Sequence, residues 1–460
     1  MKRLFSIILT LLLVLNASTV VSTATSEPPT IVGETGVLID AASGEILYEK
    51  NMHQQMYPAS TTKIITALLA LEHLDLDKTV TIDDETPFTG GSRIYLLEGE
   101  RVTVEQLLYA LMTESANDAA DALGKEIAGS IPAFAEMMNK KAVELGAKNT
   151  NFVNPHGLHD AEHVSTAYDL AMIAREAMKN DKFRELVTTY RYIIPETNMQ
   201  ETRYLYNTNR LLYDEVTKVS ANGVIRPAKY EGVTGIKTGY TGQASGCLVA
   251  GAKRGGTELI AVVLKSTDSG RFGDCIALLD YGFANYKCAL AIEAGADLGE
   301  IKVNRGSVRE VGVIAAETAF ATLPIEASTE VVKTKVILED KVRAPISAGQ
   351  KVGVVEIYEG DKLIGQVDAV ANGDILEGGL LSIVGITDST AQKIKNIIVT
   401  IIILLLVLLT AYILIKRRQV KMRKKRRRER QRRMESKVQN SQDQYFRYTK
   451  LMDSSTRGRF

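Results

Sequence analysis

The chain has 460 residues, of which 45% are hydrophobic and 24% charged. That length exceeds one typical domain, and the composition excludes a collagen-like or largely disordered chain. The net charge of +1 hides two opposite segments: residues 25–392 carry 34 Lys+Arg against 51 Asp+Glu, and residues 416–460 carry 18 against 4. The three cysteines (Cys247, Cys275 and Cys288) are too few for a disulfide framework, so we interpret them as packing residues.

The N-terminus has the pattern of a secretory signal. Two basic residues after Met1 precede an apolar stretch from Leu4 to Leu15, and the small residues 22–24 follow. We therefore expect residues 1–24 to be a signal peptide. The acidic part of the chain would then lie outside the membrane.

The first elements in chain order are two strands and a helix with a reactive serine. Residues 36–50 predict two strands around an Ala-Ser-Gly turn. Pro58 and Ser60 suit a helix start, and the apolar run that follows predicts a helix buried nearly all round. Ser60 is the only serine with a lysine three residues on, and a helix places such residues on one face. Lys63 can therefore be a base for the Ser60 hydroxyl.

Ser115-Ala116-Asn117 follows, between helical patterns. A hydroxyl and an amide two residues apart at a turn suit a proton relay and the binding of a substrate amide. The same triplet recurs at Ser220-Ala221-Asn222, in a Gly- and Pro-containing region without apolar periodicity. We therefore favour the first copy.

A histidine-rich segment is the rival site. It contains His156, His159, His163, Asp160 and Glu162. A His-x-x-His spacing can place two imidazoles on one metal, but the His-Glu-x-x-His pattern of zinc peptidases is missing. Asn154-Pro155 and Gly157 also predict a loop. We therefore expect no metal site.

The third motif is Lys237-Thr238-Gly239, which we expect to begin a strand. Its glycines permit close backbone approach to a ligand. An ammonium beside a hydroxyl can bind a carboxylate, and the N–H of Tyr240 can form an oxyanion hole with that of Ser60. A hairpin turning at residues 254–256 follows.

The C-terminal part changes character near residues 287–296. Before it, we place one domain over residues 30–290; after it, alternating runs predict a small all-β domain over residues 297–385. Residues 396–415 contain no charge and are long enough to span a bilayer. The basic tail, residues 416–460, should remain cytoplasmic under the positive-inside rule, and we favour this over nucleic-acid binding.

Together the three motifs resemble those of penicillin-binding proteins. More narrowly, the chain resembles the low-molecular-weight penicillin-binding proteins that are serine D-alanyl-D-alanine carboxypeptidases. The similarity runs from about Gly36 to Ala371 and includes the segments NFVNPHGL, GIKTGYT and LLDYGF. It implies a mixed α/β (α+β) transpeptidase/β-lactamase-like domain, a C-terminal all-β sandwich domain and, here, one transmembrane helix.

The resemblance also implies roles for individual residues. Ser60 would be the acylated nucleophile, Lys63 its base and Ser115 a proton shuttle. Burial and the nearby Lys237 cation should both disfavour charge on Lys63. Substrate would be bound by the following residues: Asn117, Lys237, Thr238, Gly239 and Tyr240.

The implied substrate is the D-Ala-D-Ala end of peptidoglycan stem peptides, with β-lactams trapped covalently and no cofactor. A β-lactamase is the first alternative, disfavoured because no Glu-x-x-Leu-Asn element lies between Ser115 and Lys237. A non-catalytic penicillin-binding sensor is the second. The chain departs from the family in two places: some members carry Arg where Thr208 stands, and many have an amphipathic C-terminal helix instead of a spanning one.

Overall fold

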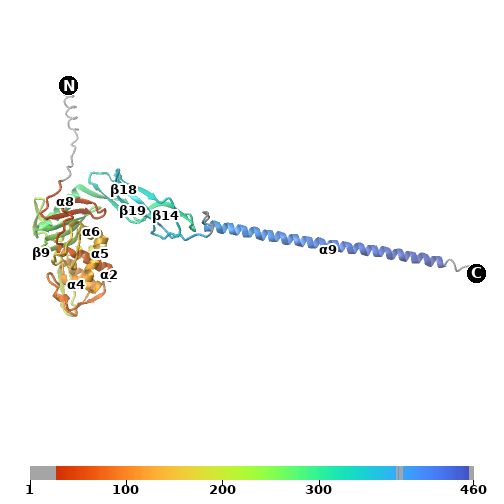
Figure 1. Cartoon of the computed structure of the whole chain (residues 1–460), viewed down its shortest axis with the longest axis horizontal. Coiled ribbons are helices and arrows are strands. Elements are labelled where there is room, and N and C mark those ends of the chain that lie inside the picture. Colours follow the sequence, from red (N-terminus) through yellow and green to blue (C-terminus); the bar gives the residue numbers. More distant parts are fainter. Residues whose placement is uncertain (1–26, 380–381, 383–386, 455–460) are drawn as a thin grey trace, which may run out of the picture. The chain divides into compact units, whose positions relative to one another are not determined.

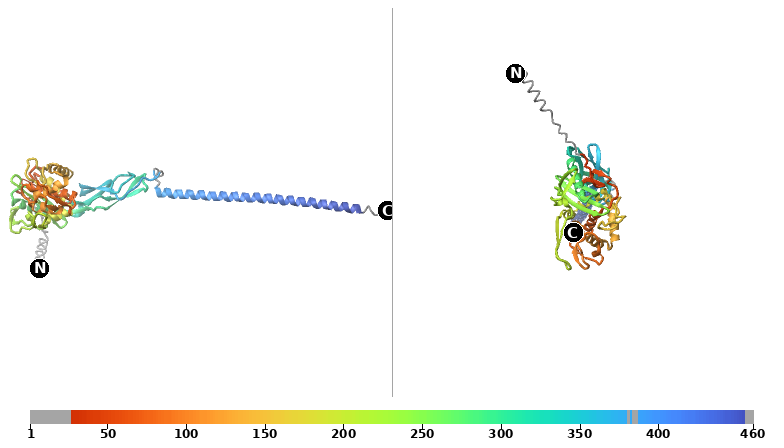
Figure 2. Two further views of the ribbon diagram at one scale, coloured as in Figure 1. Left: turned by 90° about the horizontal axis from the view of Figure 1, so that it is seen from below. Right: turned by 90° about the vertical axis from the view of Figure 1, so that its left-hand side faces the viewer.

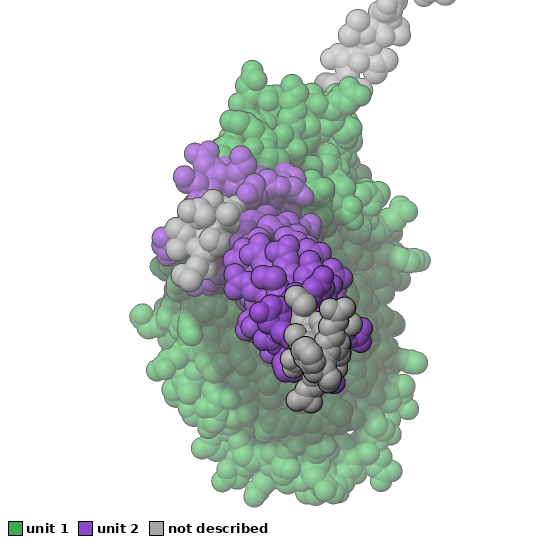
Figure 3. All heavy atoms as spheres, turned by 90° about the vertical axis from the view of Figure 1, so that its right-hand side faces the viewer, with its two compact units in different colours: residues 1–297, 314–337, 353–369 green, residues 298–313, 338–352, 370–460 purple. Residues whose placement is uncertain are grey.

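The computed structural model describes residues 27–379, 382 and 387–454. The predicted signal peptide lies outside them. The chain divides into two compact units, shown in separate colours in Figure 3. The first comprises Met1–Asp297, Ile314–Ile337 and Gly353–Ala369, and the second Leu298–Val313, Leu338–Val352 and Val370–Phe460.

A five-stranded antiparallel sheet forms the centre of the first unit (Figures 1 and 2). Its strand order is β2-β1-β11-β10-β9. The strands are β1 (Thr35–Asp40), β2 (Ile46–Lys50), β9 (Val233–Thr241), β10 (Ser245–Arg254) and β11 (Thr257–Ser266). The β1–β2 turn and the β10–β11 hairpin confirm both sequence predictions. Because β9 is an edge strand, one row of its backbone groups is free of the ladder.

Helices cover both faces of this sheet. On β11, Ile260 and Val262 face one apolar cluster, whereas Leu259 and Ala261 face the other, as the two-residue period of a strand requires. The first cluster includes residues of α2 (Lys63–His73), α3 (Val104–Thr113), α4 (Asn117–Ala128), α5 (Ile131–Glu144), α6 (Ala167–Ala177) and α7 (Asp181–Thr188). The second includes residues of α8 (Gly270–Asn285). Helix α2 is buried along most of its length, as its sequence predicted.

The cysteine side chains fit the packing interpretation. Cys247 belongs to the first apolar cluster and Cys275 to the second. Cys288 is half-buried, and all three thiols are free. Burial raises the pKa of each thiol, to about 11 for Cys247 and about 12 for Cys288.

Short elements connect these helices and strands. They are η1 (Ala59–Thr62), β3 (Thr79–Thr81), η2 (Thr86–Phe88), β4 (Arg101–Thr103), β5 (Arg191–Ile194), β6 (Arg203–Tyr206), η3 (Arg210–Leu212), β7 (Lys218–Ala221) and β8 (Val224–Pro227). Three of the pairs are two-stranded antiparallel sheets: β3–β4, β5–β6 and β7–β8.

Between α8 and the C-terminal helix the described chain is built of strands, which confirms the expected all-β character. These strands are β12 (Tyr286–Ile292), β13 (Asp297–Asn304), β14 (Glu310–Ala315), β15 (Ala319–Pro324), β16 (Val332–Leu338), β17 (Val342–Arg343), β18 (Lys351–Glu359) and β19 (Lys362–Ala371). A single 3-10 turn, η4 (Thr329–Val331), interrupts them. In the first unit β12 pairs antiparallel with β15, and in the second β13 pairs parallel with β17. The domain boundaries remain predictions.

Helix α9 (Asp388–Ser454) contains the apolar segment of residues 396–415. Among the described residues it is the one helix long and apolar enough to cross a membrane, and this segment is not buried inside the protein. A helix that exposes twenty consecutive uncharged residues fits a membrane anchor.

Candidate active site

Ser60 lies in η1, immediately before α2. The α-helix itself begins at Lys63, so Ser60 precedes it by one 3-10 turn rather than starting it. Side chains three residues apart are eclipsed in a 3-10 turn. As a result, Lys63 Nζ lies 3.1 Å from Ser60 Oγ.

The Lys63 amine is fully buried and contacts three oxygens. Besides Ser60 Oγ, these are Asn117 Oδ1 at 2.6 Å and the His156 carbonyl at 2.7 Å. A neutral amine has two N–H groups and one lone pair. The Asn117 amide oxygen and the His156 carbonyl oxygen can only accept hydrogen bonds. If the two N–H groups donate to these oxygens, the lone pair faces the Ser60 hydroxyl. This geometry suits a base.

Electrostatics favours the same neutral form. Burial, followed by the charge of Lys237, holds the pKa of Lys63 well below its usual 10.5, while the smaller effects of Asp121 and Asp118 oppose this. Lys237 is also buried. Its burial and the nearby Arg271 lower the pKa of Lys237 to about 7. The expectation that charge on Lys63 is disfavoured is thus confirmed in direction and cause.

Ser115 and Asn117 flank the turn between α3 and α4. Ser115 has a left-handed backbone with φ +59°, and its buried Oγ has no hydrogen-bond partner among the described residues. Asn117 is fixed on three sides: Oδ1 accepts from Lys63, Nδ2 donates to the Gly90 carbonyl at 2.7 Å, and its backbone N–H donates to Ser92. The alternative Ser220 is an exposed residue of β7.

The Lys237-Thr238-Gly239 triplet lies within β9, not at its start, because this strand already begins at Val233. Gly239 brings the strand against η1: a Cβ there would lie 3.0 Å from the Pro58 carbonyl oxygen and 3.1 Å from the backbone nitrogen of Ser60. A Cβ at such distances would be tighter than ordinary van der Waals contact, so a side chain here would push the two segments apart. Tyr240 follows and is exposed.

Two further residues lie near the triplet: Arg271, which belongs to none of the predicted motifs, and Thr208, which the sequence analysis named only as a departure from the family. Arg271, at the start of α8, donates from Nη1 to the Gly239 carbonyl over 2.8 Å and is largely buried. Thr208 Oγ1 lies 2.6 Å from Thr238 Oγ1. Lys237, Arg271 and these hydroxyls create a positive, hydrogen-bonding region suited to a carboxylate.

The histidines of the rival site have contacts within the protein. His163 Nε2 lies 2.9 Å from Thr62 Oγ1, and its Nδ1 accepts from the Val153 N–H. Burial lowers the pKa of His163 to about 4 and that of His156 to about 3. In the described part of the chain, no three His, Cys, Asp or Glu side chains are placed to hold a metal ion. The segment instead presents the His156 carbonyl to Lys63.

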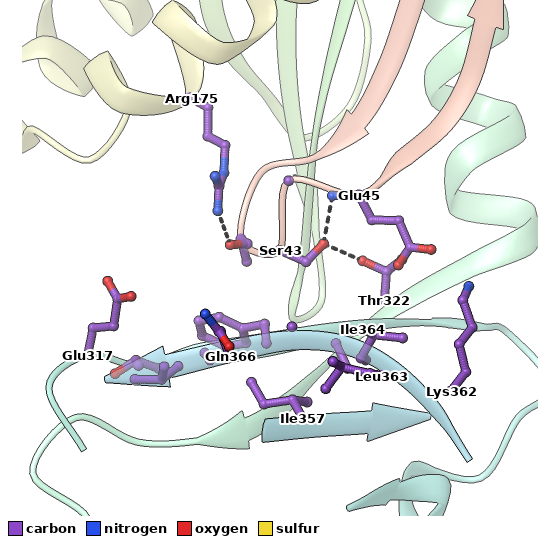
Figure 4. Close-up of a pocket in the computed structure, with 18 residues that line it drawn as sticks. Ser43, Glu45, Arg175, Glu317, Thr322, Ile357, Lys362, Leu363, Ile364 and Gln366 are labelled. Atoms are coloured by element: carbon purple, nitrogen blue, oxygen red, sulfur yellow. Dashed lines mark hydrogen bonds between the residues drawn. The ribbon is translucent and has the colours of Figure 1, made fainter. Parts of the chain in front are cut away.

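A separate hollow of about 460 Å³ lies in the first unit beside the turn of residues 42–45 (Figure 4). None of the predicted site residues lines it. Two of its polar side chains have partners within the protein: Arg175 donates to the carbonyls of Ala41 and Ala42, and Ser43 Oγ lies 2.6 Å from Thr322 Oγ1.

Comparison with known proteins places this geometry in a family. Residues 22–268 match the D-alanyl-D-alanine carboxypeptidase family model, and the chain belongs to that family. Residues 286–377 match the C-terminal domain of penicillin-binding protein 5.

Individual relatives cover most of the chain. It is 34% identical over 355 residues to the D-alanyl-D-alanine carboxypeptidase DacF of Bacillus subtilis, covering 76% of this chain and 87% of that one. It is also 34% identical over 364 residues to the D-alanyl-D-alanine carboxypeptidase DacA of Haemophilus influenzae, and this match covers 77% of this chain and 88% of that one. Penicillin-binding protein 5 of Haemophilus influenzae is a similar solved structure, with a TM-score of 0.61 at 31% identity, covering 76% of this chain and 100% of that one.

Gly157 offers a test of how Ser60 is positioned. Its φ is +86°, and a Cβ there would lie 1.8 Å from the Ala59 carbonyl oxygen, so Gly157→Ala must displace the residue before Ser60. We expect acylation by a fluorescent penicillin to slow at least about 10-fold, because small misplacements of reacting groups are costly. Gly146→Ala is the matched control, with φ +83° and open space around its Cβ. Equal rates in the two variants would contradict this account.

Proposed function

We propose that this chain is a serine D-alanyl-D-alanine carboxypeptidase that removes the terminal D-alanine from peptidoglycan stem pentapeptides, with Ser60 as its nucleophile. One observation carries the proposal: in a member of this family, a fully buried amine of lowered pKa lies 3.1 Å from a serine hydroxyl. Serine is unreactive without such a base.

In the first step Ser60 Oγ attacks the carbonyl carbon between the two terminal D-alanines. The neutral Lys63 amine takes the hydroxyl proton as the bond forms. The oxyanion would be stabilised by the backbone N–H groups of Ser60 and Tyr240, because Gly239 brings β9 against η1. The proton held by Lys63 then passes through the Ser115 hydroxyl to the departing amine, the C–N bond breaks, and D-alanine leaves with Lys63 neutral again.

The terminal carboxylate distinguishes a carboxypeptidase from an endopeptidase. We assign its binding to Lys237 and Thr238, with Arg271 beside them. Arg271 is held in place by its bond to the Gly239 carbonyl and by an ion pair with Asp268 at 2.8 Å. Asn117, whose amide is fixed by Lys63 and Gly90, would contact the substrate backbone.

In the second step a water molecule hydrolyses the Ser60 ester, and Lys63 again accepts the proton. A β-lactam enters the same first step because its ring amide resembles the scissile bond. Its leaving amine remains tethered to the acyl group, so it cannot diffuse away. The acyl-enzyme therefore persists.

The carboxylate assignment predicts a substrate-dependent defect. Thr238→Val removes a hydroxyl at nearly constant volume, and a hydrogen bond to a charged group contributes about 1.5–3 kcal/mol. We expect hydrolysis of a free D-Ala-D-Ala terminus to fall about 10- to 100-fold, and that of its C-terminal amide at most about threefold. Thr234→Val, on the same strand, is the control, because Thr234 bonds to Glu258 instead. Equal losses on both substrates would refute the role.

We further propose that the domains before α9 lie outside the cytoplasmic membrane and that the basic tail lies inside. The tail begins directly after Ile415, so translocating it would carry 18 Lys+Arg across the bilayer. An anionic inner leaflet would also attract these residues by about 1 kcal/mol each.

Cysteine labelling in intact cells tests this orientation. A cysteine placed at the exposed Ser328 should react with a membrane-impermeant maleimide, whereas one placed at Ser455 should react only after the cells are lysed. The parent chain gives the background from its own thiols. Labelling at position 455 in unbroken cells would reverse the proposed orientation.

A further inference from the structure

Asp121 is a largely buried carboxylate beside His156, with its side chain 13% exposed. It lies on α4 four residues after Asn117, so both side chains project from the same face of the helix. Its Oδ2 accepts from Thr89 Oγ1 at 2.6 Å. Its Oδ1 is buried and has no hydrogen-bond partner among the described residues. Burying a carboxylate oxygen without a hydrogen-bond partner costs folding free energy. A functional role for this oxygen would explain why it is placed here.

The imidazole of His156 lies beside this oxygen. His156 Nδ1 accepts the backbone N–H of Leu158 at 3.1 Å, so that nitrogen carries no proton in the neutral ring. The proton is then on Nε2, which lies 3.5 Å from Asp121 Oδ1. This distance is longer than an ordinary hydrogen bond, but a small shift of either side chain closes it.

The neutral form of His156 follows from its surroundings. Burial is the main cause that lowers the pKa of His156, to about 3. At neutral pH the ring is therefore a single tautomer, with Nε2–H facing Asp121. Its own backbone carbonyl meanwhile accepts from Lys63 Nζ at 2.7 Å.

We propose that Asp121 is a positioning residue for Lys63, acting through His156. Its carboxylate holds the imidazole by Nε2–H, and the imidazole in turn fixes the carbonyl that orients the Lys63 amine toward Ser60. The inference rests on the proposed function, because it concerns the base of that reaction. Asp121 itself does not touch the reacting atoms.

The neighbouring Asp118 is a useful comparison, because its carboxylate has a structural role. It accepts the backbone N–H groups of Ile94, Leu96 and Ala119, so its oxygens are accounted for by the loop they hold. Within the described ranges, no backbone N–H donates to Asp121. One of its oxygens is paired with Thr89, and the other is left for His156.

The charges around Asp121 are compatible with an ionised carboxylate at neutral pH. Burial raises the pKa of Asp121 to about 6, and the nearby Asp118 adds to this, whereas Thr89, Lys125 and Lys63 lower it. Thr89 Oγ1 also lies 2.9 Å from the Thr86 carbonyl. It can therefore turn its proton there and accept a donor in place of the carboxylate, as an asparagine amide would require.

Two substitutions separate positioning from charge. Asp121→Asn keeps an acceptor for His156 Nε2–H, and Asp121→Leu removes it with a side chain of the same branching but larger volume. We expect the second-order rate constant of acylation by a fluorescent penicillin at pH 7 to stay within about threefold in Asp121→Asn and to fall about 10- to 100-fold in Asp121→Leu. Because this constant is measured on protein that labels, loss of folded protein lowers the amplitude and not the rate.

Further variants test whether Asp121 acts through His156. Glu126→Leu, on the same helix but paired with Lys78 at the surface, should leave the rate unchanged. His156→Ala should slow acylation as much as Asp121→Leu does, and combining the two should add little further loss, because both act through one contact. The His156 variant also tests the proposal should Asp121→Leu fail to fold.

The outcomes are distinct. Equal rates in Asp121→Leu and wild type, an undiminished rate in His156→Ala, or fully additive losses in the double variant would each overturn the role of Asp121. If wild-type protein itself is not acylated at Ser60, the proposed function fails first, and the variants carry no information about it.

Discussion

The buried Lys63 amine is the constraint on which the rest of the site depends. A charged ammonium at this depth would be costly, and the second cation Lys237 makes it more so. A neutral amine can remain only if its N–H groups are satisfied, and two acceptors from distant parts of the chain do this: Asn117 at the start of α4 and the His156 carbonyl. Each contact that keeps the amine neutral also directs its lone pair toward Ser60. Stability and reactivity thus have the same cause.

Close backbone approaches at two glycines complete the arrangement. Gly239 lets β9 lie against the backbone of Pro58 and Ser60, and Gly157 lets the histidine-rich loop lie against Ala59. The turn that carries Ser60 is therefore packed between a strand and a loop. Ala59 has a left-handed backbone with φ +49°, an uncommon conformation for a residue with a Cβ. Packing from both sides explains how it is maintained, and it fixes the nucleophile relative to its base.

Much of this arrangement could be predicted from local sequence. Ser60 and Lys63 are neighbours because of helical geometry alone, and the strands around residues 40–46 and 254–257 carry clear turn signals. The His156 carbonyl could not be predicted, because every residue has a carbonyl and only the tertiary fold selects one. Arg271 and Asp121 belong to no short motif. The strand β9 was predicted to begin at Lys237 but begins at Val233, because Gly232 and Gly235 are typical of a loop. An edge strand nevertheless tolerates glycine.

The most direct measurement is mass spectrometry of the purified protein after exposure to a penicillin, followed by peptide mapping. The account predicts one added penicillin per chain, attached to the peptide containing Ser60 and persisting for minutes or longer. Ser60→Ala should show no adduct while remaining folded. An adduct on another residue, or undiminished labelling of Ser60→Ala, would contradict the central claim. Rapid return to unmodified protein with hydrolysed penicillin would instead identify a β-lactamase.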